Sequence, residues 1–294
     1  MIKTNSFQAW VLAARPKTLT GAAIPVLLGC GLAFMYGKFN LTPALLCLLF
    51  AFLMQIDANL INDLFDFLKG SDREDRLGPE RACSQGWITP KAMGIGIGVT
   101  TFIACCVGLS LLLFAGWELI PIGIACVLGA FLYTAGPYPL AYHGWGDLMV
   151  LVFFGFVPVG CTYYIMAHDW NTSVTIASLA CGLVIDTLLM VNNFRDRDQD
   201  AVSGKKTLVV RFGAKFGLGM YLFLGLIACW LCFYFLTLGK IYAVLLPQVY
   251  LISHINTTRK MARINHGKAL NSILGETSRN ILIFGLMLAV GMLL

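Results

Sequence analysis

The sequence from residue 42 to residue 66 reads TPALLCLLFAFLMQIDANLINDLFD. Residues 42–61 form an almost unbroken apolar run, and a polar stripe begins within the last turns of that run. A helix of about 20 apolar residues crosses the hydrocarbon core of a bilayer. Because hydrocarbon leaves free backbone N–H and C=O groups unsatisfied, a run of this length must be helical. The stretch therefore predicts a membrane helix that brings acidic and amide side chains to one membrane face.

The rest of the chain repeats this apolar pattern. Hydrophobic residues make up 58% of the sequence, charged residues only 12%, and the mean hydropathy is +0.78, which is unlike a soluble domain. We predict an all-α integral membrane protein, a bundle of nine transmembrane helices, and a single domain over 1–294 because no break in composition divides it. The expected spans are 18–36, 42–61, 92–115, 118–134, 147–166, 173–192, 216–237, 239–254 and 278–294.

The basic residues predict how the chain lies in the membrane. Only Lys38 and Lys240, of 21 Lys and Arg residues, fall in one set of loops. Short basic loops remain cytoplasmic, so we expect a multi-pass protein of the bacterial cytoplasmic membrane with a cytoplasmic N-terminus and an outer C-terminus. Cations at the inner face meet anionic lipids and phosphorylated substrates, which argues against a nucleic-acid partner.

A second polar cluster ends the sixth run, four spans after the first. Because four is an even number, both clusters emerge on the same, cytoplasmic face. Residues three, four and seven apart share one face of a helix, so each cluster forms a stripe. The first stripe contains Asn59, Asn62, Asp63 and Asp66, and the second contains Asn193, Asp196 and Asp200.

Clustered carboxylates repel one another unless a cation lies between them. Hard oxygen ligands favour Mg²⁺, which also bridges to phosphate oxygens. Two facing stripes would therefore hold a diphosphate through Mg²⁺, with Asp66, Asp196 and Asp200 as main ligands and Asn62 and Asp63 assisting. The plainer alternative is that these acids are only solvated helix ends.

Basic residues accompany both stripes, and a diphosphate leaving group needs such cations to take up its developing charge. Any one of them could instead be a topology signal or a lipid contact. The candidates after the first stripe are Lys69, Arg73, Arg76 and Arg81, and those around the second are Arg195, Arg197, Lys205, Lys206 and Arg211.

These motifs resemble the UbiA superfamily of intramembrane prenyltransferases, and within it the branch that acts on 1,4-dihydroxy-2-naphthoate. The similar stretches are NDLFDFLKGSD at 62–72, NNFRDRDQD at 192–200 and GKKTL at 204–208, with shorter ones at 14–19, 146–147 and 270–277. The superfamily pattern expects an acid four residues after Asp66, where this chain has Gly70. The next acid is Asp72, a shift that resembles the naphthoate branch and makes Asp72 a further candidate metal ligand.

The resemblance implies a nine-helix bundle and Mg²⁺-dependent transfer of a polyprenyl chain from its isoprenoid diphosphate to 1,4-dihydroxy-2-naphthoate, with loss of CO₂. Arg15 and Lys17 would bind the acceptor carboxylate. From the residues themselves, the ring faces of Tyr133, Tyr138 and Tyr142, near Asp147, are candidates to stabilise the prenyl cation. Any one of these tyrosines could instead be an interfacial anchor. The chain length of the prenyl donor stays open, and a 4-hydroxybenzoate or homogentisate type of acceptor is the alternative.

Two other classes of membrane protein compete with this interpretation. A secondary transporter would use the intramembrane acids Asp57 and Asp186 as ion sites. Its polar groups would gather at the midplane, whereas here most of the acids lie at one face. A CDP-alcohol phosphotransferase would need a single compact motif of Asp interleaved with Gly and Ala-Arg, which the sequence lacks.

Overall fold

The computed structural model describes residues 2–70 and 76–294, and all regular structure in these ranges is helical. Most helices are long and apolar, as the composition predicts. Their bounds are α1 Phe7–Ala14, α2 Leu19–Met35, α3 Leu41–Leu68, α4 Pro90–Ser110, α5 Leu119–Thr134, α6 Gly146–Val150, α7 Cys161–Ala167, α8 Thr172–Val202, α9 Leu208–Phe212, α10 Ala214–Leu231, α11 Ile241–Leu245, α12 Val249–Ile264 and α13 Asn271–Leu293.

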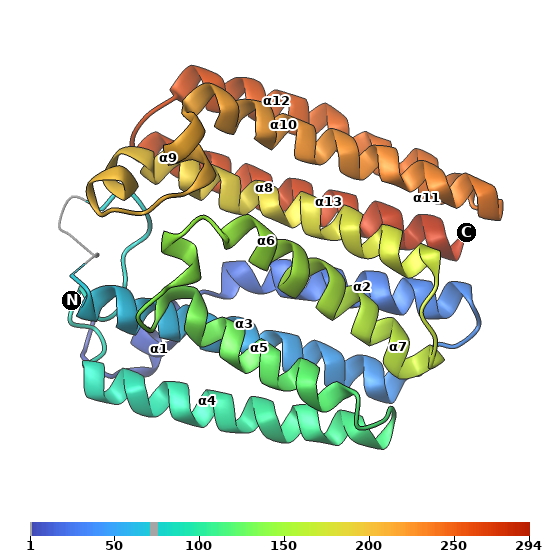
Figure 1. Ribbon diagram of the computed structural model, residues 1–294, viewed down its shortest axis with the longest axis horizontal. Helices are drawn as coiled ribbons and strands as arrows, with labels where there is room; N and C mark the ends of the chain where they lie inside the picture. Colours follow the sequence, from blue (N-terminus) through green and yellow to red (C-terminus); the bar gives the residue numbers. More distant parts are fainter. Residues whose placement is uncertain (1, 71–75) are drawn as a thin grey trace.

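The long helices run side by side along the long axis of a bundle (Figure 1). The N-terminus lies at one end and the C-terminus at the other. Helices α3 and α8 both finish at the end that holds the N-terminus, where the connections to α4 and α9 also lie. Both polar stripes therefore reach the same end of the bundle.

The two motif helices begin in the same way but differ in their surroundings. Asn40 caps α3 by accepting from the Thr42 amide, and Asn171 caps α8 by accepting from the Val174 amide. Within the most apolar part of α8, 67% of the residues are buried, against 33% for α3 and 17% for α4. Helix α8 is thus the centre of the bundle, with α4 at its edge.

Close glycine contacts hold the segment after α6 against α8. Residues Leu151–Gly160 form a π-helix between α6 and α7. A Cβ on Gly155 would lie 2.6 Å from the Ser178 carbonyl oxygen and 3.0 Å from the Gly182 Cα, so no larger residue fits there without movement. Small residues allow membrane helices to approach in this way. This contact helps to set the position of α6, whose first turn contains the predicted site residue Asp147.

The structure confirms the helical class but not the predicted number of spans. Within 2–70 and 76–294, seven helical segments are long and apolar enough to cross a membrane, and they match seven of the nine expected runs. The run at 118–134 gives the shorter helix α5, of 16 residues. The run at 239–254 gives α11 and the start of α12, whose second half carries basic side chains and so loses hydropathy. Both runs are helical, but the nine-span count is not confirmed.

Candidate active site

The stripe at the end of α3 centres on Asp66, which is 4% exposed. One guanidinium nitrogen of Arg81 lies 2.8 Å from Asp66 Oδ2. The other carboxylate oxygen of Asp66, Oδ1, is buried and has no hydrogen-bond partner among the residues the structure describes. A buried carboxylate oxygen without a partner is costly, so this atom is a strong candidate to accept a ligand or metal contact.

Asp63, three residues earlier, holds a loop. Its Oδ2 accepts from the Ala82 amide and its Oδ1 from the Cys83 amide, each at 2.9 Å. The side chain is 1% exposed. Both oxygens of this predicted ligand are therefore engaged with the backbone, which gives Asp63 the role of an anchor for the segment that follows the first motif.

That segment, residues 76–83, joins the two motif ends. Arg81 donates to the carbonyl of Asn62 on α3. The Leu77 carbonyl accepts from Asn271 at 2.8 Å, and a Cβ on Gly78 would lie 2.9 Å from a guanidinium nitrogen of Arg195. The segment therefore contacts α3 on one side and α8 and α13 on the other.

The stripe at the end of α8 has its own cations. Arg195 donates to both oxygens of Asp196, at 2.7 and 2.6 Å, and also to Asn271 at 2.9 Å. The Asp196 side chain is 23% exposed. Asp200 pairs with Lys205, with 3.4 Å between Oδ1 and Nζ. Each acid is thus balanced by a neighbour close in sequence.

The two stripes meet around Lys205 and Tyr142. The Lys205 ammonium lies 4.9 Å from the centre of the Tyr142 ring, and the Lys69 ammonium lies 5.0 Å from it. Burial lowers the pKa of Lys205, but the charges of Asp200 and Asp66 outweigh burial and raise it overall. One cation therefore senses an acid from each motif helix.

Lys69 completes this cluster from the α3 side. Its ammonium donates to the carbonyl of Thr134, and Thr134 in turn donates to Asn62 at 2.9 Å. Burial lowers the pKa of Lys69; the charge of Asp66 opposes this shift, and the Lys205 charge adds to it. Lys69 is one of the basic residues that the sequence places beside the first stripe, three residues after Asp66. Arg73, from the same group, lies outside the described residues.

Two further acids, Asp147 and Asp186, lie near Tyr133. Tyr133 is within electrostatic range of Asp147, Asp186, Asp66 and Asp200. Asp147 begins α6 and Asp186 lies in α8, two turns before the second stripe. Each has one buried oxygen without a hydrogen-bond partner in the described part of the chain. Tyr133 is therefore near both the stripe acids and this deeper pair, and the substrate-binding roles of Tyr133 and Asp147 stay predictions.

Several predicted residues make contacts away from this cluster. Asn59 donates to the Ala14 carbonyl at 3.0 Å and to Thr18 at 2.9 Å, so it fastens the segment before α2 onto α3. Arg15 lies in that segment, in a left-handed backbone conformation with φ of 51°. Tyr138 is 55% exposed and stacks on His143, with ring centres 3.5 Å apart.

The remaining predictions have less structural support. Lys17 and Lys206 are exposed, and neither side chain makes a hydrogen bond or ion pair with a described residue. Asn193 is half-buried, and Arg76 donates to the Pro79 carbonyl at 3.1 Å. Asp72, the further candidate metal ligand, lies outside the described residues. All of these assignments stay predictions.

The donor set suits a hard divalent ion. Among the described residues, no three His, Cys, Asp or Glu side chains come together as a ready metal cage. Mg²⁺ does not need one, because it usually binds through one or two carboxylates, several waters and substrate phosphates. The unpaired Asp66 oxygen and the acids Asp196 and Asp200 fit that pattern.

Comparisons with known proteins agree with this geometry. The profile of the UbiA prenyltransferase family matches residues 22–273. The chain is 40% identical over 212 residues to a 1,4-dihydroxy-2-naphthoate octaprenyltransferase of Escherichia coli, covering 70% of this chain and 69% of that protein. It is 38% identical over 208 residues to a 1,4-dihydroxy-2-naphthoate octaprenyltransferase of Mycobacterium tuberculosis, covering 71% of each.

A solved structure shows the same fold. A UbiA homologue from Archaeoglobus fulgidus, bound to DMAPP and Mg²⁺, superposes with a TM-score of 0.66 over 96% of this chain and 99% of that one, at 16% identity. At that identity the likeness concerns the fold alone. The family match covers most of the chain, including both acidic stripes. The chain therefore belongs to the UbiA prenyltransferase family and is a prenyltransferase.

Proposed function

We propose that this enzyme transfers a polyprenyl chain from its diphosphate to 1,4-dihydroxy-2-naphthoate with loss of CO₂, and that it depends on Mg²⁺. The observation that carries the donor half of the proposal is the convergence of Asp66 and Asp200 on the single cation Lys205. Acids and cations from both motif helices then surround one small region, which is the arrangement that a metal-bound diphosphate needs.

The acids of the two stripes would hold the metal. Asp66, through its unpaired oxygen, is the first candidate ligand, followed by Asp196 and Asp200, with Asn62 close by. Bound Mg²⁺ supplies Lewis-acid chemistry that draws electron density toward the diphosphate. Asp63 is a weaker candidate, because both its oxygens already accept from backbone amides.

The cations would stabilise the leaving group. As the allylic C–O bond breaks, its electron pair stays with the diphosphate, and charge develops on the phosphate oxygens. Arg81, Arg195 and Lys205 each contact a stripe acid, which places their positive charge beside the proposed diphosphate site. Charge-assisted hydrogen bonds of this kind are stronger than neutral ones and favour departure of the diphosphate.

The bundle interior would receive the prenyl cation and the acceptor. Apolar helices exclude water, which would otherwise hydrolyse the cation, and the Tyr133 ring face would stabilise it. An electron-rich carbon of the acceptor ring forms the new C–C bond, and release of the carboxylate as CO₂ returns an electron pair to the ring. Asp147 lies near Tyr133 and would orient the acceptor hydroxyls, while Arg15 and Lys17 stay the proposed carboxylate ligands.

The acceptor is proposed from the curated relatives, five of which carry the name 1,4-dihydroxy-2-naphthoate octaprenyltransferase at 32–40% identity. We also propose that all 294 residues form one domain in the bacterial cytoplasmic membrane. The positive-inside distribution supports a cytoplasmic N-terminus and active site and an outer C-terminus.

An assay with three acceptors tests the function. Purified enzyme in detergent receives Mg²⁺, a prenyl diphosphate and either 1,4-dihydroxy-2-naphthoate, 4-hydroxybenzoate or homogentisate. We expect prenylated product, diphosphate and CO₂ in equal amounts with the naphthoate, and none of them after chelation with EDTA. Product from only one of the other two acids would contradict the acceptor, and full turnover in EDTA would contradict the metal requirement.

A further inference from the structure

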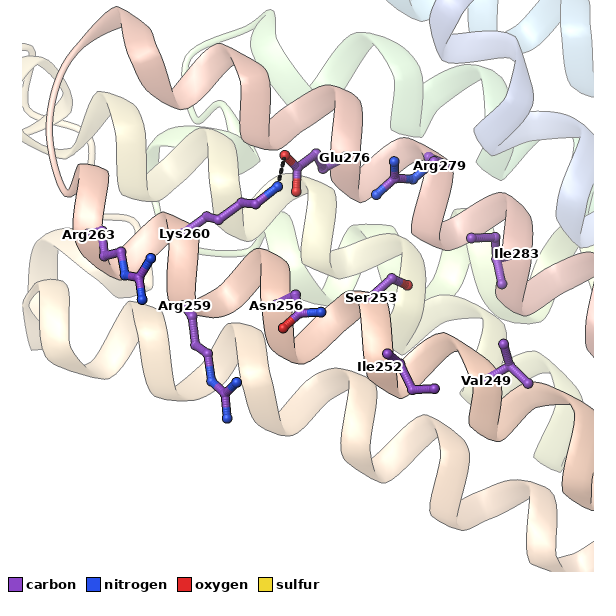
Figure 2. A pocket seen from close by; sticks show the side chains of 10 residues that line it. All are labelled: Val249, Ile252, Ser253, Asn256, Arg259, Lys260, Arg263, Glu276, Arg279 and Ile283. Carbon is purple, nitrogen blue, oxygen red and sulfur yellow. Dashed lines mark hydrogen bonds and ion pairs between the residues drawn. The ribbon is translucent and has the colours of Figure 1, made fainter.

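A groove of about 510 Å³ lies between α12 and α13 (Figure 2). Residues of these two helices line it, and none of its lining residues belongs to α3 or α8. Its polar end is on the same end of the bundle as the acidic stripes, because α12 finishes and α13 begins there (Figure 1). The groove is therefore separate from the proposed active site and shares its side of the membrane.

Positive charge dominates one part of this groove. Four basic side chains and one acid line it: Arg259, Lys260, Arg263, Arg279 and Glu276. Lys260 and Glu276 neutralise each other through a contact of 2.8 Å, drawn as a dashed line in Figure 2. The three arginines are exposed, and they form no ion pair or hydrogen bond with any described residue. Three cations thus have no counter-charge within residues 2–70 and 76–294.

Arg279 is the most informative of the three. It lies in α13, within the candidate span Lys268–Leu293, eight residues after the helix begins at Asn271. At 1.5 Å per residue, that places it about 12 Å along the helix axis. A charged side chain on the surface of a membrane span is costly unless it finds an opposite charge or reaches the interface. An anion from the membrane itself would supply that charge.

The other end of the groove is apolar. Val249, Ile252 and Ile283 lie there, beyond Ser253 and away from Arg263, as Figure 2 shows. Val249 is 52% exposed and Ile252 69% exposed, so their side chains are available to a hydrocarbon chain. The groove therefore changes from cationic to apolar along its length, which matches a molecule that has an anionic head and acyl chains.

We propose that the groove between α12 and α13 is a binding site for an anionic phospholipid. Its phosphate binds Arg279 together with Arg259 or Arg263, and its acyl chains lie on Val249, Ile252 and Ile283. Basic pockets between membrane helices on the cytoplasmic side suit such headgroups. Guanidinium groups also bind phosphate oxygens in a bidentate manner. The proposal does not depend on the reaction or on the acceptor.

Native mass spectrometry of the full-length protein tests the site. The protein is delipidated in a neutral detergent and titrated with phosphatidylglycerol, with phosphatidylcholine of the same chains, with inorganic phosphate and with a prenyl diphosphate. The test variant carries Arg259→Gln, Arg263→Gln and Arg279→Gln. A matched control removes three exposed charges elsewhere, through Lys3→Gln, Lys91→Gln and Lys215→Gln.

We expect wild type and the control to retain the first bound phosphatidylglycerol. The apparent affinity of the arginine variant for this lipid should be at least about tenfold lower, because each cation near an anionic headgroup contributes severalfold. Equal melting temperatures of both variants in detergent alone would show that folding is intact. Equal retention of phosphatidylglycerol by both variants would overturn the proposal. So would retention of phosphatidylcholine, inorganic phosphate or prenyl diphosphate at this site in place of the anionic lipid.

Discussion

The ends of α3 and α8 bear similar acidic stripes but hold them by different means. At the end of α3, Asp63 and Asp66 are fixed by residues 15 to 20 positions later, in the segment that returns over the helix end. At the end of α8, Asp196 and Asp200 are balanced by Arg195 and Lys205, their near neighbours in sequence. The first stripe is built by long-range folding and the second by local sequence.

This difference separates structural from chemical roles. Removing an acid of the first stripe should loosen the segment 76–83, which also contacts α8 and α13. Stability and activity should then fall together. A residue that faces the proposed diphosphate site should lose more activity than stability. Removing an acid of the second stripe should disturb the fold less, because its partner is close in sequence on or next to the same helix. Substitutions in matched pairs can therefore test the comparison.

The largest expected effect is on turnover. Asp66→Asn should lower kcat by about a hundredfold or more, because it changes the unpaired buried oxygen proposed to meet the metal. Asp198→Asn is a control on α8, since the Asp198 side chain is 74% exposed and its ion pair is with His266, which is itself exposed. The assay is prenyl transfer at saturating substrate. Equal activity of wild type and Asp66→Asn would remove Asp66 from the proposed metal site.

The next effect is on stability. Asp63→Asn should leave the Ala82 or Cys83 amide without an acceptor, which costs about 1–3 kcal/mol. We expect the melting temperature in detergent to fall by several degrees and proteolysis of the 76–89 segment to become faster. Asp196→Asn should change the melting temperature less. If Asp196→Asn were the more destabilised variant, the distinction between long-range and local anchoring would be wrong.

A smaller effect concerns pH. The acids around Lys205 raise its pKa above the ordinary 10.5. A raised lysine pKa contributes stability that is fully present below the ordinary pKa and is lost as the pH rises through the raised value. The melting temperature of wild type should exceed that of Lys205→Met by a constant amount from pH 7 to about 9, and the gap should close above about pH 10.5. A difference in melting temperature that grew above pH 10.5 would contradict the attraction between Lys205 and the acids Asp200 and Asp66.

Local spacing in the sequence was enough to predict the helical class, the two stripes and their common end of the bundle. Apolar length and the three- and four-residue steps are local properties, and they identify Asp66, Asp196 and Asp200 directly. The family resemblance is confirmed by the match over residues 22–273. The transporter alternative is wrong, because the chain is a prenyltransferase.

Spacing did not reveal which acids the fold itself uses. Asp63 and Asp66 lie on one stripe, yet one holds the Ala82 and Cys83 amides and the other keeps a free oxygen. That distinction depends on how residues 76–83 fold back onto the end of α3, and helical spacing in the sequence does not predict this. Asn59 is similar, since its amide is used to hold the segment before α2. The nine-span count stays a prediction, because the runs at 118–134 and 239–254 form helices that are shorter or less apolar than the other seven.

The smallest expected effect sharpens the comparison at the end of α8. Lys205 and Lys206 are adjacent, and the sequence gives no reason to prefer either. The structure places Lys205 between Asp200 and the Tyr142 ring, whereas the exposed Lys206 side chain makes no contact of this kind with the part of the chain that the structure describes. Lys206→Gln should therefore change kcat/KM less than about twofold, as surface charges rarely contribute more. Lys205→Gln should lower it at least tenfold in the same assay. A reversed order would mean that diphosphate binds outside the cluster around Tyr142.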